Sequence, residues 1–322
     1  MVHATDSILL SDDDLAFFRL TCDLFPAPES PLRYLEDGAH EPADLEQCFG
    51  SLKSRNLLNP AGAGAASHVA DRLTPVSECS ARVTLSVKGV KAHSRSFYLA
   101  GNTTVEYRKT AAGHAFGPPR TEGALAVELS QLFKTGARRD PLQVRMSAGD
   151  YLVFAVFARD LRAAPKAATG PEAPMSVEEV LAYFDEPESK VVRTPTDDAW
   201  EKSIVTLTRL GVLERKDTTY SLQRRWHPVA CEIVADHQHV ISRHDYLDEQ
   251  WLVREVSLYP TSSAVFRLGT ANDGSVAIEE LTATTLANVV AGVIGTLPNL
   301  LNPEAPPSLK HPMLGTRAPQ SR

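Results

Sequence analysis

The sequence lacks the signals of disulfide-linked, zinc-binding and membrane-spanning proteins. Its four cysteines are widely spaced and form no C-x-x-C pair: Cys22, Cys48, Cys79 and Cys231. We expect reduced thiols in the core of a cytoplasmic protein, because isolated cysteines favour neither a zinc site nor a disulfide framework. Ile8-Leu9-Leu10 is too short for a signal peptide. No segment approaches the roughly 18 apolar residues of a spanning helix, so we expect no membrane insertion.

Clustered positive charge is also missing. The formal net charge is −7, and the first fifty residues hold eleven acidic residues against two arginines, which leaves +2 for the rest. Affinity for nucleic acid depends on lysines and arginines that neutralise phosphates. A nucleic-acid partner is therefore disfavoured.

The common catalytic motifs are absent. Gly62-Ala63-Gly64 lacks the later glycine and the Lys-Ser/Thr pair of a phosphate-binding loop. The sequence contains neither a G-x-S-x-G nucleophile turn nor an H-E-x-x-H or EF-hand pattern. We therefore expect no catalytic residues, no cofactor and no enzymatic activity.

One histidine cluster leaves a metal-dependent enzyme open as an alternative. His237 and His239 are two residues apart, and His244 and Asp245 follow. Two histidines at this spacing on a strand share a face and could bind one metal with a third ligand. The simpler interpretation places them on the solvent side of a strand, and the matching stretch of the first half, residues 83–87, has no histidine.

Short sequence matches recur in the same order in the two halves of the chain. The pairs are Ser51-Leu52 with Thr206-Leu207, Leu57-Leu58 with Val212-Leu213, Leu73-Thr74-Pro75-Val76 with Trp226-His227-Pro228-Val229, Val105-Glu106-Tyr107-Arg108 with Ala264-Val265-Phe266-Arg267, and Leu125-Ala126 with Leu286-Ala287. Conserved order at low identity is typical of a duplicated unit. Two long copies predict a pseudo-twofold globular protein instead of a repeat array.

Each predicted copy contains helices followed by strands and a closing helix. Helix N-caps at Ser11 and Ser176 open the two copies. The period-two pattern of residues 82–87 predicts a half-buried strand, with neighbours at 97–99, 103–107 and 142–146, and the apolar run 151–157 predicts a central strand. The predicted fold class is α+β, with two pseudo-twofold-related repeats that each contain an antiparallel sheet and flanking helices.

Composition predicts the domain boundaries. Prolines and alanines concentrate in residues 163–174, which we interpret as a linker, and prolines return after residue 300. The first repeat is expected over 1–162 and the second over 175–300, followed by a Pro-rich flexible tail over 301–322.

A second alternative is a winged-helix DNA-binding regulator. Residues 200–210 predict a helix, and residues 211–222 have the pattern of a turn and a β-wing. The matching loop of the first half, residues 59–62, has no basic wing, and the acidic chain would repel DNA.

Most of residues 7–300 resembles the EspG family, the cytosolic specificity chaperones of mycobacterial type VII secretion. The matching features are a short strand into a capped helix (8–24), a block of two helices that ends in proline (45–75), strands from about Val83, and an amphipathic helix (122–133). The resemblance implies a non-enzymatic cytosolic chaperone or adaptor. Such a protein shields the hydrophobic helical surface of a partner, such as a small helical secreted protein.

A docking surface for such a partner needs exposed apolar anchors inside a polar rim. The second half supplies the best candidates: Trp251, Leu252, Val253, Val256, Leu258 and Tyr259. The expected charged rim is Asp245, Asp248, Glu249 and Glu255. Aromatic anchors carry most of the energy of many interfaces, so Trp251 and Tyr259 are the leading partner-binding residues.

Overall fold

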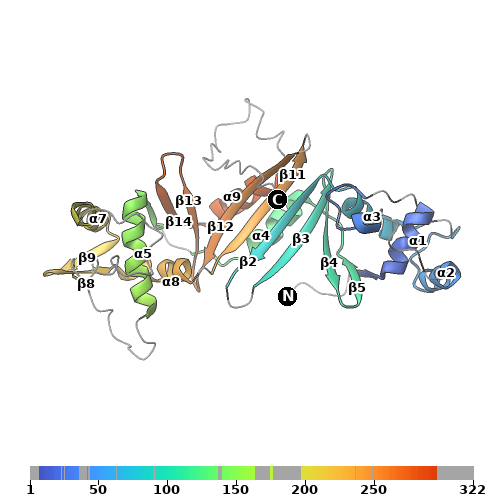
Figure 1. The fold of residues 1–322 in the computed structure, drawn as a ribbon, viewed down its shortest axis with the longest axis horizontal. Helices are drawn as coiled ribbons and strands as arrows, with labels where there is room; N and C mark the ends of the chain where they lie inside the picture. Colours follow the sequence, from blue (N-terminus) through green and yellow to red (C-terminus); the bar gives the residue numbers. More distant parts are fainter. Residues whose placement is uncertain are drawn as a thin grey trace.

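The computed structural model describes residues 7–22, 24, 26–35, 42, 44–62, 64–89, 92–136, 140–163, 175–176, 197–235, 237–247 and 250–295. These residues form one eleven-stranded sheet, one three-stranded sheet and helices on both faces of the large sheet (Figure 1). Every strand pair in both sheets is antiparallel. The predicted α+β class is confirmed.

The first part of the chain contributes helices and then a strand meander. Its elements are β1 (Ile8–Leu10), α1 (Asp12–Cys22), η2 (Arg33–Leu35), α2 (Leu45–Ser54), α3 (Ser67–Ser77), β2 (Ala81–Val87), β3 (His93–Ala100), β4 (Thr103–Thr110), β5 (Gly113–Phe116), β6 (Arg120–Thr121) and α4 (Glu122–Gln131). The predicted strand into a capped helix, the period-two strand and the closing helix are all present.

The second part contributes the same kinds of element and an additional small sheet. Its elements are β7 (Gln143–Met146), α5 (Ala148–Ala163), β8 (Met175–Ser176), α7 (Asp197–Arg209), β9 (Leu213–Lys216), β10 (Thr219–Leu222), η4 (Arg224–Trp226), α8 (His227–Val234), β11 (His239–Leu247), β12 (Gln250–Pro260), β13 (Val265–Thr270), β14 (Val276–Leu281) and α9 (Ala283–Ile294).

The large sheet is built from two meanders that meet at its centre. Its order is β1-β5-β4-β3-β2-β11-β12-β13-β14-β7, with β6 beside β4. At the junction Thr84 of β2 lies opposite Ser242 of β11. Each outer strand, β1 and β7, leads directly into a helix. An internal duplication would produce this order, but the duplication itself stays a prediction.

Helices cover the two faces of the sheet differently. Behind the sheet, α4 and α9 pack against apolar side chains of the central strands, including Phe97, Ile241 and Leu258 (Figure 1). In front, α1, α2 and α3 cover one end, and α5, α7 and α8 cover the other. Between these two groups, front-facing residues of the central strands stay half-buried, among them Thr84, Ser86, Val240, His244 and Tyr246. The middle of the front face is thus only partly covered by helices.

Residues 151–157, predicted as a central strand, lie in helix α5, so that prediction is wrong. The helix begins with a capping box, in which Ser147 Oγ accepts from the Asp150 amide at 3.1 Å and Asp150 Oδ2 accepts from the Ser147 amide at 3.2 Å. An apolar run alone does not distinguish a buried strand from a buried helix. The Ser-x-x-Asp pattern was the signal that sequence reasoning missed.

The linker and the second helix start fall mainly outside the described residues. Ser176 belongs to strand β8, and residues 164–174 and 177–196 are not described. β7 pairs with β14, and α5 packs with α7 and α8 in one core. β7 and α5 thus pack with elements of the second part of the chain, and the predicted domain boundaries stay a prediction.

The predicted helix and wing are present in the second part. Helix α7 leads into the β9–β10 hairpin, and β8 adds to β10 to give the order β8-β10-β9. Within the described ranges, no helix is long and apolar enough to cross a membrane.

Candidate functional site

The best candidate site is a group of three aromatic rings on the front face, which we call the aromatic patch: His244, Tyr246 and Trp251. The ring centroids of Trp251 and Tyr246 are 5.3 Å apart, and those of Trp251 and His244 are 6.1 Å apart, both with edge-to-face geometry. The Trp251 residue is 45% exposed. It is the one aromatic residue among the exposed large apolar residues of the described chain.

The β11–β12 hairpin positions these rings. Tyr246 lies directly opposite Trp251, and His244 lies opposite Val253. Because alternate residues of a strand share a face, His244 and Tyr246 project to the same side as their partners on β12. A directly opposed aromatic pair stabilises a hairpin by about 0.2–1 kcal/mol, so the strands hold Trp251 in place without burying it.

Charged and polar groups adjoin the aromatic patch. Arg82 of β2 lies opposite His244, and Glu255 is exposed two residues beyond Val253. The Nε2 atom of His244 is 3.2 Å from Ser242 Oγ. Burial, followed by the positive charge of Arg82, lowers the pKa of His244 below its ordinary value of 6.5. His244 is therefore neutral at pH 7, and the aromatic patch is apolar with charges at its edge.

The structure separates the residues predicted to bind a partner. Trp251 is exposed and Val253 is half-buried on the front face, whereas Val256 and Leu258 lie in the core behind the sheet with α9. Tyr259 is 7% exposed and packs into the core formed by α5, α7 and α8. The prediction grouped residues along one strand, but a strand alternates its side chains between two faces. Val256, Leu258 and Tyr259 are therefore core residues in this conformation, and a contact role for them stays a prediction.

The predicted charged rim is also divided. Glu255 is exposed beside Val253, whereas Asp245 is buried behind the sheet. Asp248 and Glu249 lie outside the described residues.

Asp245 belongs to a buried ionic cluster that sequence reasoning missed. Its two carboxylate oxygens accept from Arg243 Nε at 2.7 Å and from Arg254 Nη2 at 3.1 Å. Arg243 Nη1 also donates to Glu122 at 2.9 Å and to the carbonyl oxygen of Ile294 in α9. Arg243 and Arg254 thus supply cations to the last turn of α9, where the helix dipole favours them. The cluster ties the hairpin that carries Trp251 to the helices behind the sheet.

The histidine cluster does not assemble as the metal alternative requires. His239 and His244 are five residues apart on β11, and His237 precedes that strand, where its Nδ1 lies 3.2 Å from Glu232 Oε2. Among the described residues, no group of three or more His, Cys, Asp or Glu side chains could hold a metal ion. His239 packs edge-on against Phe133 at 5.3 Å, which is a core contact.

A second histidine network has catalytic residue types, but its histidine is shielded from solvent, although the Asp12 side chain is 44% exposed. His114 is fully buried, and its Nε2 and Nδ1 lie 2.9 Å from Asp12 Oδ1 and 2.8 Å from the Tyr107 hydroxyl. Tyr34 donates to the same Asp12 oxygen at 2.7 Å, which is the main reason that the pKa of Asp12 is lowered. These bonds join β5, β4, η2 and the start of α1. Because the His114 ring is fully buried, we interpret the network as structural.

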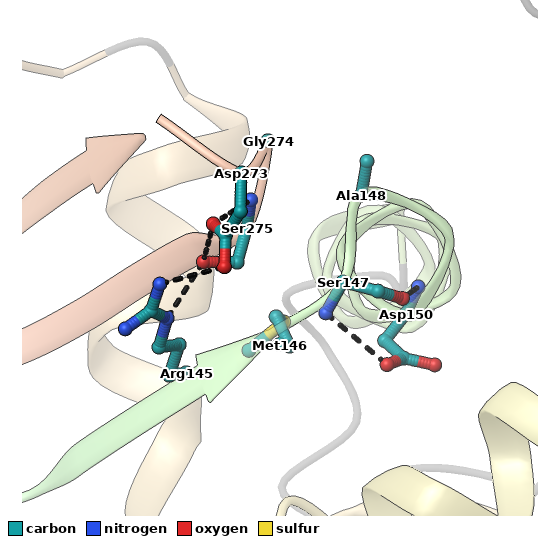
Figure 2. Close-up of a pocket in the computed structure, with 8 residues that line it drawn as sticks. All are labelled: Arg145, Met146, Ser147, Ala148, Asp150, Asp273, Gly274 and Ser275. Atoms are coloured by element: carbon teal, nitrogen blue, oxygen red, sulfur yellow. Dashed lines mark hydrogen bonds and ion pairs between the residues drawn. The ribbon is translucent and has the colours of Figure 1, made fainter. Parts of the chain in front are cut away.

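A hollow of about 410 Å³ lies between the start of α5 and the β13–β14 turn (Figure 2). Its polar side chains already have partners: Arg145 donates to Asp273 at 2.8 Å and to Ser275 at 2.7 Å, and Ser147 and Asp150 cap the helix. The hydrogen bond from Ser275 is the main cause of the lowered pKa of Asp273, about 2. These residues form a stable turn and a helix cap, and they provide no general base or nucleophile.

Comparison with known proteins returns a likeness of shape alone. No protein-family model and no curated protein matches the sequence. A solved structure of the type VII secretion system chaperone EspG5 from Mycobacterium tuberculosis, in complex with a PE25-PPE41 dimer, is similar with a TM-score of 0.48 and 13% identity. The match covers 89% of this chain and 95% of that one. We therefore take the function from the geometry of this chain alone.

Proposed function

We propose that this chain is a non-enzymatic binding protein that docks an apolar helical surface of a protein partner on the aromatic patch. The observation that carries this proposal is the 45% exposure of Trp251 on the front face of the sheet. An exposed tryptophan supported by two neighbouring rings, with Arg82 and Glu255 nearby, has the composition of a binding hot spot. A role as a secretion chaperone or adaptor is the specific form that we favour.

Rigid support behind the sheet favours this function. The ionic cluster around Asp245 and the core formed with α9 fix the strand that carries Trp251. A side chain that is fixed before binding loses little conformational entropy on association. The aromatic patch is therefore suited to bind without rearrangement.

The experiment is to identify the partner by affinity capture from native lysate and then to measure its affinity for Trp251→Ala. We expect a loss of at least about 2 kcal/mol, or roughly thirtyfold, with little change in the thermal midpoint. Leu20→Ala is the matched control, because Leu20 is 50% exposed on α1, far along the sheet order from β12. A large drop in the midpoint of Trp251→Ala with unchanged affinity would contradict the proposal.

The exposed charges of the helix and wing do not favour DNA binding. On α7 the exposed residues Asp198 and Glu201 offset Lys202 and Arg209. On the wing, Glu214 and Asp217 offset Arg215 and Lys216. A DNA-binding surface instead concentrates one sign of charge. Salt-sensitive retention of DNA by the purified protein would reverse this conclusion.

A further inference from the structure

The outer face of helix α7 carries an exposed apolar residue between opposite charges. Val205 is 62% exposed, the highest value among the exposed large apolar residues of the described chain. Glu201 lies four residues before it and Arg209 four residues after it, and both are exposed. At 3.6 residues per turn these three residues form one stripe along the helix. The opposite face of α7 buries Trp200, Ile204 and Leu207 in the core.

Among the residues that the structure describes, the charges of this stripe have no charged partner. Neither Glu201 nor Arg209 has an ion pair or a hydrogen bond to another side chain in the described structure. Some part-buried carboxylates and arginines of the described residues are paired, as with Glu106 and Arg95 at 2.8 Å or Glu279 and Arg267 at 2.6 Å. A helix stripe with an exposed valine at its centre, an unpaired acid on one side and an unpaired base on the other is complementary to a second, antiparallel copy of the same stripe.

We propose that this α7 stripe is a homodimer interface, in which α7 of a second copy packs antiparallel across Val205. A twofold axis through Val205 brings Glu201 of each copy opposite Arg209 of the other. The match is geometric, because each charge lies four residues, or about 6 Å, from the centre along the helix. One contact therefore contains a central Val205 pair and two equivalent ion pairs, which is the pattern of an isologous twofold interface.

The position of α7 is compatible with this assembly. Helix α7 lies at one end of the elongated molecule, whereas β11 and β12 lie near its middle (Figure 1). A dimer through α7 leaves the aromatic patch free, so this inference does not depend on the proposed function. One helix from each copy makes a small contact, and we expect a weak dimer with a dissociation constant on the order of 10 µM.

The test is sedimentation velocity of the full chain over a concentration series at low salt. We expect wild type to shift from monomer to dimer, and Glu201→Arg and Arg209→Glu each to weaken dimerisation at least about tenfold, because each places two like-charged pairs in the contact. Both positions are exposed, so the thermal midpoints of these variants should stay close to wild type.

Mixing the two variants is the decisive step. In the mixed dimer the two substituted side chains carry opposite charges and face each other, while the unchanged Arg209 of one chain faces the unchanged Glu201 of the other. The mixture should dimerise like wild type, whereas each variant alone should dimerise at least about tenfold more weakly. Added salt should weaken both dimers, since exposed ion pairs are screened. A monomeric wild type throughout the series, a single variant that dimerises as strongly as wild type, or a mixture that dimerises no better than the single variants would each overturn the proposal.

Discussion

Helices α2 and α7, which precede the two meanders, end with the same backbone geometry. After α2 the Leu57 amide donates to Leu52 O at 2.9 Å, and after α7 the Val212 amide donates to Leu207 O at 2.9 Å. The residue just before each donor is left-handed: Asn56 has a φ of 56° and Gly211 a φ of 68°. Asparagine and glycine are the residues that most readily adopt this conformation at a helix end. Two of the predicted sequence matches therefore correspond to one local structure.

The helices that follow the two edge strands begin alike as well. Ser11 and Asp14 form a capping box at 2.9 and 3.0 Å before α1, as Ser147 and Asp150 do before α5. The closing helices share a threonine N-cap, Thr121 for α4 and Thr282 for α9. β7 and α5 are thus the counterparts of β1 and α1. This comparison predicts that residues 143–294 superpose on residues 8–131, which an experimental structure would test.

The two matched segments that contain a proline, residues 73–76 and 226–229, do not take equivalent positions in the two halves. Pro75 lies two residues before the end of α3, whereas Pro228 is in the first turn of α8. The small sheet β8-β10-β9 in the second half also stands where the first half has only a bridge between Leu58 and Ala65. If the halves share an origin, they have diverged most in the helices on the front face.

The halves differ most clearly in their ion pairs. The side chains of Arg95 and Glu106 in the first half are 24% and 12% exposed, whereas those of Arg243, Asp245 and Arg254 are 5%, 9% and 5% exposed. Water can partly replace a lost partner in the first cluster but not in the second. We therefore expect the same kind of substitution to have very different effects in the two halves.

The largest expected effect is that of Asp245→Ala. It leaves Arg243 and Arg254 without their shared carboxylate in the core, and should lower the free energy of unfolding by about 3–5 kcal/mol. The matched change Glu106→Ala should cost only about 1 kcal/mol, because Arg95 keeps Glu128 at 2.9 Å and some contact with water. Urea denaturation of both variants measures the difference. Equal losses would show that burial does not distinguish the two clusters.

An intermediate effect is expected at the two capping boxes. Ser11→Ala and Ser147→Ala should each cost about 1 kcal/mol, because each leaves a first-turn amide without its acceptor. Similar losses would support the equivalence of α1 and α5. Ser94→Ala, at an exposed position of β3, is the control and should change stability by less than about 0.5 kcal/mol. If Ser147→Ala resembled this control while Ser11→Ala did not, the two helix starts would not be equivalent.

The sequence predicted the fold best where a local pattern determines the structure. The alternation of residues 82–87 and the N-cap at Ser11 correspond to β2 and α1. Residues 151–157 were mistaken for a strand because their burial depends on contacts with α7 and α8, which lie far away in sequence. The spacing of apolar residues along a short segment carries no information about contacts with residues far away in sequence.

The candidate site was only partly predictable for the same reason. Trp251 was predicted as an exposed anchor and its side chain is exposed, but an anchor role stays a prediction, and its neighbours Tyr246 and His244 come from the opposite strand. Their proximity depends on the register of the β11–β12 hairpin, which the sequence alone did not provide. Whether the aromatic patch binds a partner stays a prediction.

The smallest expected effect concerns pH and tests whether acid sensitivity belongs to the second half. Burial lowers the pKa of both His239 and His244 below 6.5, with His93 and His237 adding to the effect at His239 and Arg82 at His244. Below pH 6.5 the unfolded chain binds protons that the native chain does not, so the free energy of unfolding should fall as the pH drops from 6.5 towards the native pKa values.

His239→Gln and His244→Gln remove these protons from both states and should each flatten the slope of stability against pH in that range. The exposed Thr284→Ala on α9 is a control for substitution itself and should move the curve without changing its slope. Denaturant midpoints at pH 5.5, 6.5 and 7.5 provide the measurement. β2, which pairs with β11 at the centre of the sheet, contains no histidine. An unchanged slope of stability against pH in both variants would show that the acid sensitivity arises elsewhere in the chain.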